Sequence, residues 1–107
     1  MRGYGGRPGR SGLKPVRLSA SAVKDISAIG NDIAADKPKA AAGFVDHLIQ
    51  RCHSLANAPE EYGLKPSYGP GVRGVTVPPC IVLYRIRERG ILTLGVRHGA
   101  RKPVAFK

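Results

Sequence analysis

The apolar residues of this chain recur with a helical period through its first half and with a strand period through its last third. Two stripes have the three- and four-residue spacing that places side chains on one face of a helix. The first stripe contains Val23, Ile26, Ile29, Gly30 and Ile33. The second stripe contains Ala41, Phe44, Val45, Leu48, Ile49, Cys52 and Leu55. Both segments are therefore predicted to be amphipathic helices.

The residues that flank the two stripes indicate where the helices begin and end. Ser19 or Ser21 can cap the first helix, because a serine oxygen accepts a hydrogen bond from an unpaired helix amide. This helix should end near Asp36, since Pro38 disfavours helical geometry in the residue before it. Pro38 itself suits the first turn of the second helix, which residues 58–59 should close. A connection this short folds the two helices back on each other as a hairpin.

Runs rich in β-branched residues, bounded by glycine and proline, predict strands. The predicted strands are Val16–Leu18 and residues 71–77, 80–87 and 91–98. A hairpin turn joins the last two strands at residues 87–90, where Gly90 can adopt positive φ. The order β-α-α-β-β-β predicts an α+β fold, in which a helical hairpin packs on one face of a small, largely antiparallel sheet.

Strand alternation divides the side chains of the last two strands between two faces. In the last strand one face holds Leu92, Leu94, Val96 and His98, and the other holds Ile91, Thr93, Gly95 and Arg97. In the preceding strand one face holds Cys80, Val82, Tyr84 and Ile86, and the other holds Ile81, Leu83, Arg85 and Arg87. We expect the leucine face of the last strand to meet the helices, with His98 at the rim of the core and Tyr84 inside it. The arginines Arg85, Arg87 and Arg97 should then line one open surface.

The 107 residues suffice for one small domain, and their formal net charge of +11 is unevenly distributed. Six of the seven acids lie between residues 25 and 61, and residues 62–107 contain only Glu88 against nine Lys and Arg. A concentrated positive field of this kind attracts polyanions and acidic partners. For Arg87 and Arg89 we favour a solubilising role, whereas Arg97, Arg101 and Lys102 suggest a partner surface, because no acid lies near them in sequence.

Residues 1–15 are rich in Gly and Arg and have almost no apolar content, so we predict a disordered basic tail. The tail could be a solvated extension, a nucleic-acid-contacting arm, or the product of a misplaced start codon. No apolar run approaches the roughly 18–20 residues that span a membrane, and we expect a cytoplasmic protein with no membrane partner. Cys52 and Cys80 lack the spacing of metal ligands and are expected to be buried free thiols. We expect neither a metal nor a cofactor.

The strongest motif is the string Gly-Val-Arg at residues 71–73, Ile-Val-Leu-Tyr-Arg-Ile at 81–86 and Ile-Leu-Thr-Leu-Gly-Val-Arg-His-Gly-Ala-Arg at 91–101. Together with Asp-Lys-Pro-Lys-Ala-Ala at 36–41 and Phe-Val-Asp-His-Leu at 44–48, this pattern resembles the ParE-type toxins of the ParE/RelE superfamily. The resemblance covers residues 16–102 and leaves residues 103–107 as a C-terminal tail. It departs from the family at Pro78-Pro79-Cys80, where a glycine and an aromatic residue are common, and in the long basic tail.

The resemblance implies a bacterial toxin of a type II toxin–antitoxin system, neutralised by a cognate antitoxin that is usually acidic and wraps an extended C-terminal segment around it. ParE-type toxins inhibit DNA gyrase without catalysis of their own, which makes the gyrase A subunit the expected target. The target-binding residues would be Arg97, His98, Arg101 and Lys102.

RelE-type relatives instead cut mRNA on the ribosome, and this activity is the alternative. Cleavage through a 2′-hydroxyl needs proton carriers and cations that stabilise the charge on phosphorus. His98, Arg73, Lys65 and Arg85 would form that catalytic site. Because His98 is the single imidazole there, we favour a structural histidine and no catalytic residues. A basic nucleic-acid-binding domain is a third reading.

Overall fold

The computed structural model of the protein describes residues 15–99 and 102–106, and it confirms the predicted α+β fold. The helices are α1 (Ala20–Asp36) and α2 (Pro38–Ser54), followed by one 3₁₀ turn, η1 (Pro66–Tyr68). The strands are β1 (Val16–Leu18), β2 (Val72–Val77), β3 (Cys80–Arg87) and β4 (Gly90–His98). The order along the chain is therefore β-α-α-β-β-β, as predicted.

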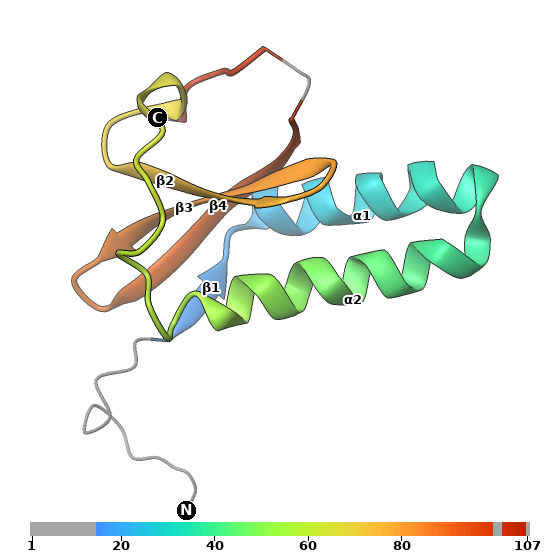
Figure 1. Ribbon diagram of the computed structural model, residues 1–107, viewed down its shortest axis with the longest axis horizontal. Helices are drawn as coiled ribbons and strands as arrows, with labels where there is room; N and C mark the ends of the chain where they lie inside the picture. Colours follow the sequence, from blue (N-terminus) through green and yellow to red (C-terminus); the bar gives the residue numbers. More distant parts are fainter. Residues whose placement is uncertain (1–14, 100–101, 107) are drawn as a thin grey trace, which may run out of the picture.

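The four strands form one sheet in the order β1-β4-β3-β2. The pairs β2–β3 and β3–β4 are antiparallel, and only β1, added beside β4, runs parallel to its neighbour. The largely antiparallel sheet is thus confirmed. The helical hairpin lies on one side of this sheet, whereas η1 and the C-terminal segment lie on the other side (Figure 1).

Both helices begin where the sequence predicts. The Ser19 side chain accepts a hydrogen bond from the Ala22 amide and so caps α1, which settles the choice between the two serines. Pro38 occupies the first turn of α2, one residue after the end of α1. The second helix ends at Ser54, earlier than the predicted stop at residues 58–59, because 3₁₀-type hydrogen bonds to the Cys52, His53 and Ser54 carbonyls replace the α-helical pattern there.

Apolar side chains fill both faces of the sheet. The main core lies between the sheet and the helices and includes Ile26, Leu48, Cys52, Leu55, Val75, Val77, Cys80, Val82, Tyr84, Ile91 and Val96. The second cluster lies on the opposite face and includes Tyr68, Val72, Leu83 and Leu94, with Ile81, Leu92 and Phe106 packed against it. The face assignments for β3, with Tyr84 in the core, are confirmed.

The prediction that the leucine face of β4 meets the helices is wrong. Leu83 pairs with Gly95 but Tyr84 pairs with Thr93, so β4 contains one extra residue, Leu94, at a bulge. A one-residue insertion exchanges the two faces of the strand on one side of the bulge. Leu92 therefore lies on the open face and Ile91 faces the helices, the reverse of the prediction. Residues 95–98, which follow the bulge, lie on the faces that were predicted for them.

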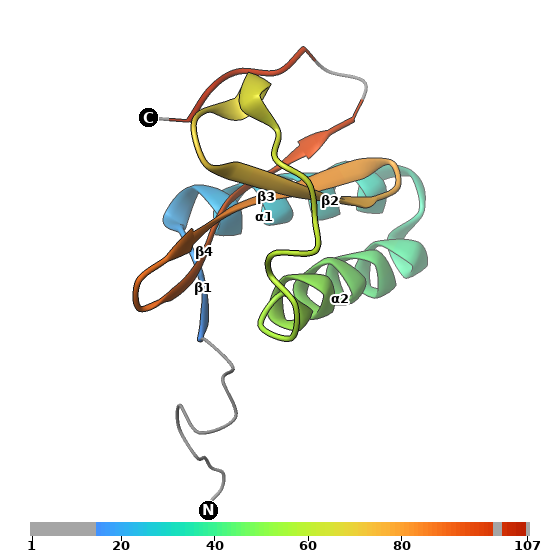
Figure 2. The same ribbon diagram turned by 60° about the vertical axis from the view of Figure 1, so that its left-hand side comes forward.

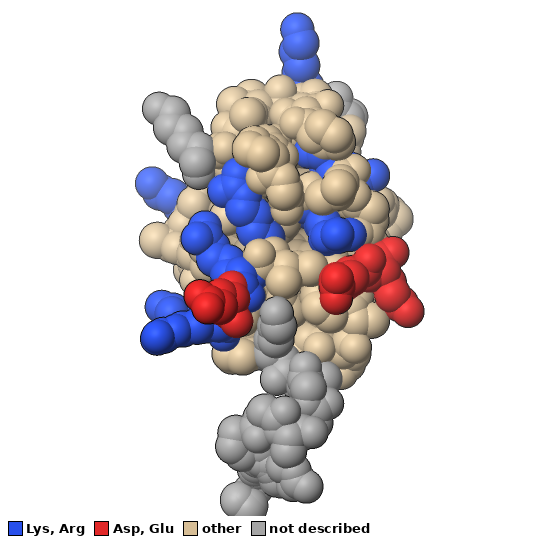
Figure 3. Space-filling model, turned by 90° about the vertical axis from the view of Figure 1, so that its left-hand side faces the viewer, with Lys and Arg blue, Asp and Glu red and all other residues tan. Residues whose placement is uncertain are grey.

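The positive charge is concentrated at the end of the molecule that carries the β3–β4 hairpin. Lys and Arg side chains spread over this end, and Asp and Glu form only two small groups there (Figure 3). Of the predicted basic tail, only Pro15 lies within the described residues. None of the described helices is long and apolar enough to cross a membrane.

Candidate functional site

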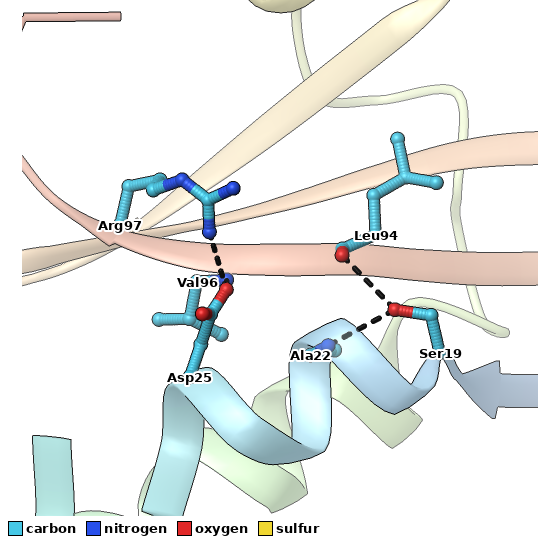
Figure 4. A network of polar contacts seen from close by, with 6 residues as sticks. All are labelled: Ser19, Ala22, Asp25, Leu94, Val96 and Arg97. Carbon is cyan, nitrogen blue, oxygen red and sulfur yellow. Dashed lines mark hydrogen bonds and ion pairs between the residues drawn. The ribbon is translucent and has the colours of Figure 1, made fainter. Parts of the chain in front are cut away.

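The site begins with the free edge of β4, which the first turns of α1 cover. β1 pairs only with residues 91–93, so the second half of β4 has no neighbouring strand on that side among the described residues. The Ser19 hydroxyl donates a hydrogen bond to the Leu94 carbonyl over 3.0 Å, while its oxygen caps α1 (Figure 4). One side chain thus fixes the start of the helix against the edge of the sheet.

Asp25, two turns further along α1, holds the next part of the same edge. Its Oδ2 accepts a hydrogen bond from the Val96 amide over 3.0 Å and forms an ion pair with the Arg97 guanidinium (Figure 4). The Arg97 and Asp25 side chains are 31% and 25% exposed, so solvent screens the pair only in part. No acid lies near Arg97 in the sequence, but the fold supplies one, because Asp25 comes from 72 residues earlier in the chain.

Arg97 also connects β4 to the C-terminal segment. Its guanidinium carbon lies 4.7 Å from the centre of the Phe106 ring, a cation–π distance. Gly95 makes this junction possible. A Cβ atom there would lie 2.8 Å from both Arg97 Nη1 and Asp25 Oδ2, and 2.9 Å from Phe106 Cζ. Three segments of the chain meet at this point, and a larger residue than glycine would displace the ends of the three side chains.

The C-terminal segment is bound to the open face of the sheet. The C-terminal segment runs beside η1 (Figure 2). The Phe106 amide donates a hydrogen bond to the Tyr68 carbonyl over 2.7 Å, and the Phe106 ring packs on the second apolar cluster. The Arg85 guanidinium donates to the Pro70 and Phe106 carbonyls. Arg85 and Arg97 therefore lie on the open surface as predicted, but both hold neighbouring backbone or side chains there.

A groove of about 680 Å³ separates α1 from the ends of β3 and β4. His98, Arg97 and Pro79 line its sheet side. Asp25, Asp32 and Asp36 line its helix side, with Ile29, Ile33 and Phe44 as apolar surface between them. His98 is exposed at the rim, as predicted, and Lys102 is exposed beyond it. Arg101 lies outside the described residues.

A second groove, of about 500 Å³, runs along the outer side of the helical hairpin. Its lining is mostly apolar and small: Leu18, Val23, Ile26, Ser27, Gly30, Asn31, Ala41, Ala42, Val45, Asp46 and Ile49. Val23 is 52% exposed in it. Leu18 belongs to β1, the outermost strand, so this groove continues directly into an edge of the sheet that no other described strand covers.

The four residues of the alternative catalytic site do not converge. Arg73 is opposite Tyr84 in the register, on the helix side, and its guanidinium donates to the Tyr62 and Glu60 carbonyls. Arg85 is opposite Val72, on the open side. His98 is opposite Cys80, which is four residues from Tyr84 along β3 and so roughly 13 Å from it at ~3.3 Å per residue. Lys65 is exposed in the loop before η1.

The remaining reactive groups are structural. The Tyr84 hydroxyl donates a hydrogen bond to the Pro59 carbonyl, and burial raises the pKa of Tyr84 to about 12. Cys52 and Cys80 are buried free thiols, as predicted, and burial raises the pKa of each. Within residues 15–99 and 102–106, no three His, Cys, Asp or Glu side chains are arranged to hold a metal ion.

The sequence predictions missed Asp25, Gly95 and Phe106, the residues that assemble this site. A signal was present for Asp25, which is three residues after Ala22 and four before Ile29 and therefore falls inside the apolar stripe of α1. An acid in such a stripe needs a partner across the interface. Gly95 and Phe106 carry no comparable signal, because their roles depend on the bulge in β4 and on the return of the C-terminal segment.

Comparisons with known proteins agree with this architecture. One similar structure is the chromosomal ParDE toxin–antitoxin system of P. aeruginosa, with a TM-score of 0.72, 21% identity, and coverage of 80% of this chain and 96% of that chain. Another is the RelBE2 toxin–antitoxin complex of Mycobacterium tuberculosis, with a TM-score of 0.56, 20% identity, and coverage of 80% and 98%. At these identities the likeness establishes the fold.

No single curated protein matches the chain significantly. The family model described as the ParE toxin of the type II toxin–antitoxin system parDE matches residues 16–103, which is most of the chain. The chain therefore belongs to the ParE family of type II toxin–antitoxin toxins.

Proposed function

We propose that this toxin inhibits DNA gyrase by binding to it, without catalysis of its own, and that a cognate acidic antitoxin neutralises it. Membership of the ParE family carries the proposal. The separation of Arg73, Arg85 and His98 supports it, because proton transfer and charge stabilisation would need these groups around one phosphate. The observed contacts instead use Arg73 and Arg85 to hold backbone carbonyls.

The proposed target-binding surface is the C-terminal end of β4 and the chain that follows it. It comprises Arg97, His98, Arg101 and Lys102, and the gyrase A subunit is the expected partner. His98 and Lys102 are exposed. Arg97 has a second role there, since its bonds to α1 and its stacking on Phe106 hold the end of β4 in place.

The proposed antitoxin site is the groove along the outer side of the helical hairpin together with the edge of β1. An apolar groove of small residues accepts an amphipathic helix, and a free strand edge accepts an extended segment. The net charge of +11 favours an acidic partner. Both known structures of this fold named above are toxin–antitoxin complexes.

The decisive test is a gyrase supercoiling and DNA-cleavage assay with the purified protein, with and without its antitoxin. We expect cleaved DNA to accumulate with the toxin and to disappear when the antitoxin is added. The double substitution Arg101→Gln and Lys102→Gln should reduce the effect at least tenfold. The charge-matched control Lys24→Gln and Lys39→Gln should leave it within twofold. Gyrase that is unaffected by active toxin would refute the proposal, and mRNA cut in translating ribosomes would favour the RelE-like activity.

A further inference from the structure

At the β3–β4 hairpin, three arginines surround a small hollow of about 320 Å³. Its lining consists of Arg17, Arg87, Arg89, Gly90, Ile91 and Leu92. The hollow lies at the opposite end of β4 from the proposed target-binding residues, since Gly90 begins this strand and His98 ends it. We propose that this hollow binds the sugar–phosphate backbone of a nucleic acid. The proposal goes beyond gyrase inhibition and does not depend on it.

The strand register brings the arginines together. Leu92 is paired with Arg17 of β1 on one side and with Arg85 of β3 on the other, so the three side chains form a row across adjacent strands on the open face. Arg87 follows Arg85 by two residues and shares its face. With strands about 4.8 Å apart, the row is about 10 Å wide. Cations distant in sequence are thus placed around one apolar floor.

Arg17, Arg87 and Arg89 differ from the other described arginines in having no partner among residues 15–99 and 102–106. Arg51, Arg73, Arg85 and Arg97 all bind carbonyls, a hydroxyl, a carboxylate or an aromatic ring. Arg17, Arg87 and Arg89 are exposed and form no hydrogen bond or ion pair with any residue that the structure describes. Gathering unpaired like charges is unfavourable unless an anion neutralises them, so the arrangement favours a ligand with several negative charges.

The chemistry of the hollow favours phosphate. A guanidinium is a planar fork of donors that binds phosphate oxygens in pairs, and it is weakly hydrated enough to give up water against apolar surface. Leu92, which is half-buried on the open face, supplies apolar surface between the cations, against which a sugar can lie. One bound phosphate leaves two arginines for its neighbours along a strand, whereas a free phosphate ion would engage only part of the cluster.

The course of the chain favours a nucleic acid over an acidic peptide. The Pro15 carbonyl accepts a hydrogen bond from the Ile91 amide over 2.9 Å, and a Cβ at Gly90 would lie 2.5 Å from the same oxygen. Pro15 is therefore held beside the hollow. Residues 1–14 contain four cations, five glycines and no acid. Arginine–glycine segments of this composition are typical of proteins that bind single strands and phosphate backbones without sequence preference.

The test is fluorescence anisotropy with a labelled 20-base-pair duplex and a labelled single strand of the same length, at 50 to 200 mM salt. The triple variant Arg17→Gln, Arg87→Gln and Arg89→Gln should bind at least tenfold more weakly. The slope of log K against the logarithm of the salt concentration should be smaller in magnitude than that of the wild type by about three, one for each lost phosphate contact. A charge-matched control, Lys24→Gln, Lys37→Gln and Lys39→Gln, removes three exposed cations from the helical hairpin and should lose less than threefold.

Equal losses in the two triple variants would overturn the proposal, because binding would then follow the overall field and not the hollow. Unlabelled poly-glutamate of equal charge is the second probe. It should compete at least tenfold less well than unlabelled DNA; equal competition would assign the hollow to acidic peptides. All three arginines are exposed and form no hydrogen bond or ion pair with the described residues, so both variants should show the wild-type melting temperature. If one variant melts at a lower temperature, the single substitutions are compared instead.

Discussion

Arg97 binds within the protein as well as at its surface, because the Asp25 carboxylate holds its guanidinium over the Phe106 ring. We expect Arg97→Gln and Asp25→Asn each to lower the free energy of unfolding by about 1 kcal/mol, the scale of a charge-assisted hydrogen bond that solvent partly screens. The double variant should lose less than the sum, with a coupling of about 0.5–1 kcal/mol. Urea unfolding of the four proteins measures this. Additive losses would mean that the two side chains act independently.

Because Arg97 also holds the end of β4 in place, a loss of toxicity in Arg97→Gln would have two causes. The variant would lose a contact with the target, and the end of β4 would become less firmly held. Asp25→Asn separates the two effects, because it loosens the same end while leaving the arginine in place. If the loosened end explains the loss, Asp25→Asn should reduce gyrase inhibition as much as Arg97→Gln does.

Tyr84 should make the free energy of unfolding fall at alkaline pH. Its pKa is raised from 10.0 to about 12 by burial, so the folded state disfavours the phenolate. The unfolded chain ionises near pH 10 and the folded chain does not, so stability is fully present below pH 10 and is lost as the pH rises towards 12. The loss should be about 2 kcal/mol. Tyr84→Phe removes the titrating group, and its unfolding free energy should fall less steeply over this pH range in urea titrations.

At the scale of elements, the sequence predicted most of the architecture, because each element carries its own signal. Helical spacing, a serine cap and Pro38 define α1 and α2, and β-branched runs broken by Pro78-Pro79 and Gly90 define the strands. The bulge at Leu94 carries no such signal. Both faces of this sheet are apolar, so a leucine can lie on either face and does not reveal the change of side at the bulge. Strict alternation along the strand therefore placed Leu92 on the wrong face.

The candidate site was less predictable than the fold because it depends on contacts between distant segments. The end of β4 was located correctly by its run of cations, and His98 lies at the rim as expected. The ion pair between Asp25 and Arg97 joins residues 72 positions apart, and Phe106 returns to a face that the sequence left open. Only the packing of α1 across the edge of β4 brings these groups together.

The groove on the outer side of the helical hairpin makes a prediction about the antitoxin. Val23→Asp places a charge where an apolar partner surface should pack, and we expect it to weaken antitoxin binding at least tenfold. Val104→Asp is the matched control, because Val104 is also an exposed valine, at 69%, but belongs to the C-terminal segment. It should bind like the wild type. Titration calorimetry with the purified antitoxin measures both, and equal affinities would place the antitoxin elsewhere.

At the scale of the whole molecule, the charges are segregated by the fold as well as by the sequence. The acids of α1 line the groove beside His98, whereas the hairpin end carries arginines with little acid around them. The protein therefore presents two surfaces of different character, and the apolar groove of the helical hairpin adjoins the arginine-rich end through β1. A partner that wraps around the toxin can respond to both.

The overall field should govern how fast an acidic antitoxin associates. The screening length falls from about 10 Å at 0.1 M salt to about 3 Å at 1 M, so we expect the association rate constant to drop at least tenfold over this range. The dissociation rate constant should change less than threefold, because the apolar groove holds the complex once it has formed.

Both triple variants, Arg17/Arg87/Arg89→Gln and Lys24/Lys37/Lys39→Gln, lower the net charge of +11 by three and should therefore slow association to a similar degree. Stopped-flow mixing checks this, and a much larger effect of the arginine set would show that the antitoxin contacts the hollow directly. The same pair of variants thus separates two uses of the positive charge, since nucleic-acid binding should respond to the arginines alone and antitoxin association to the total.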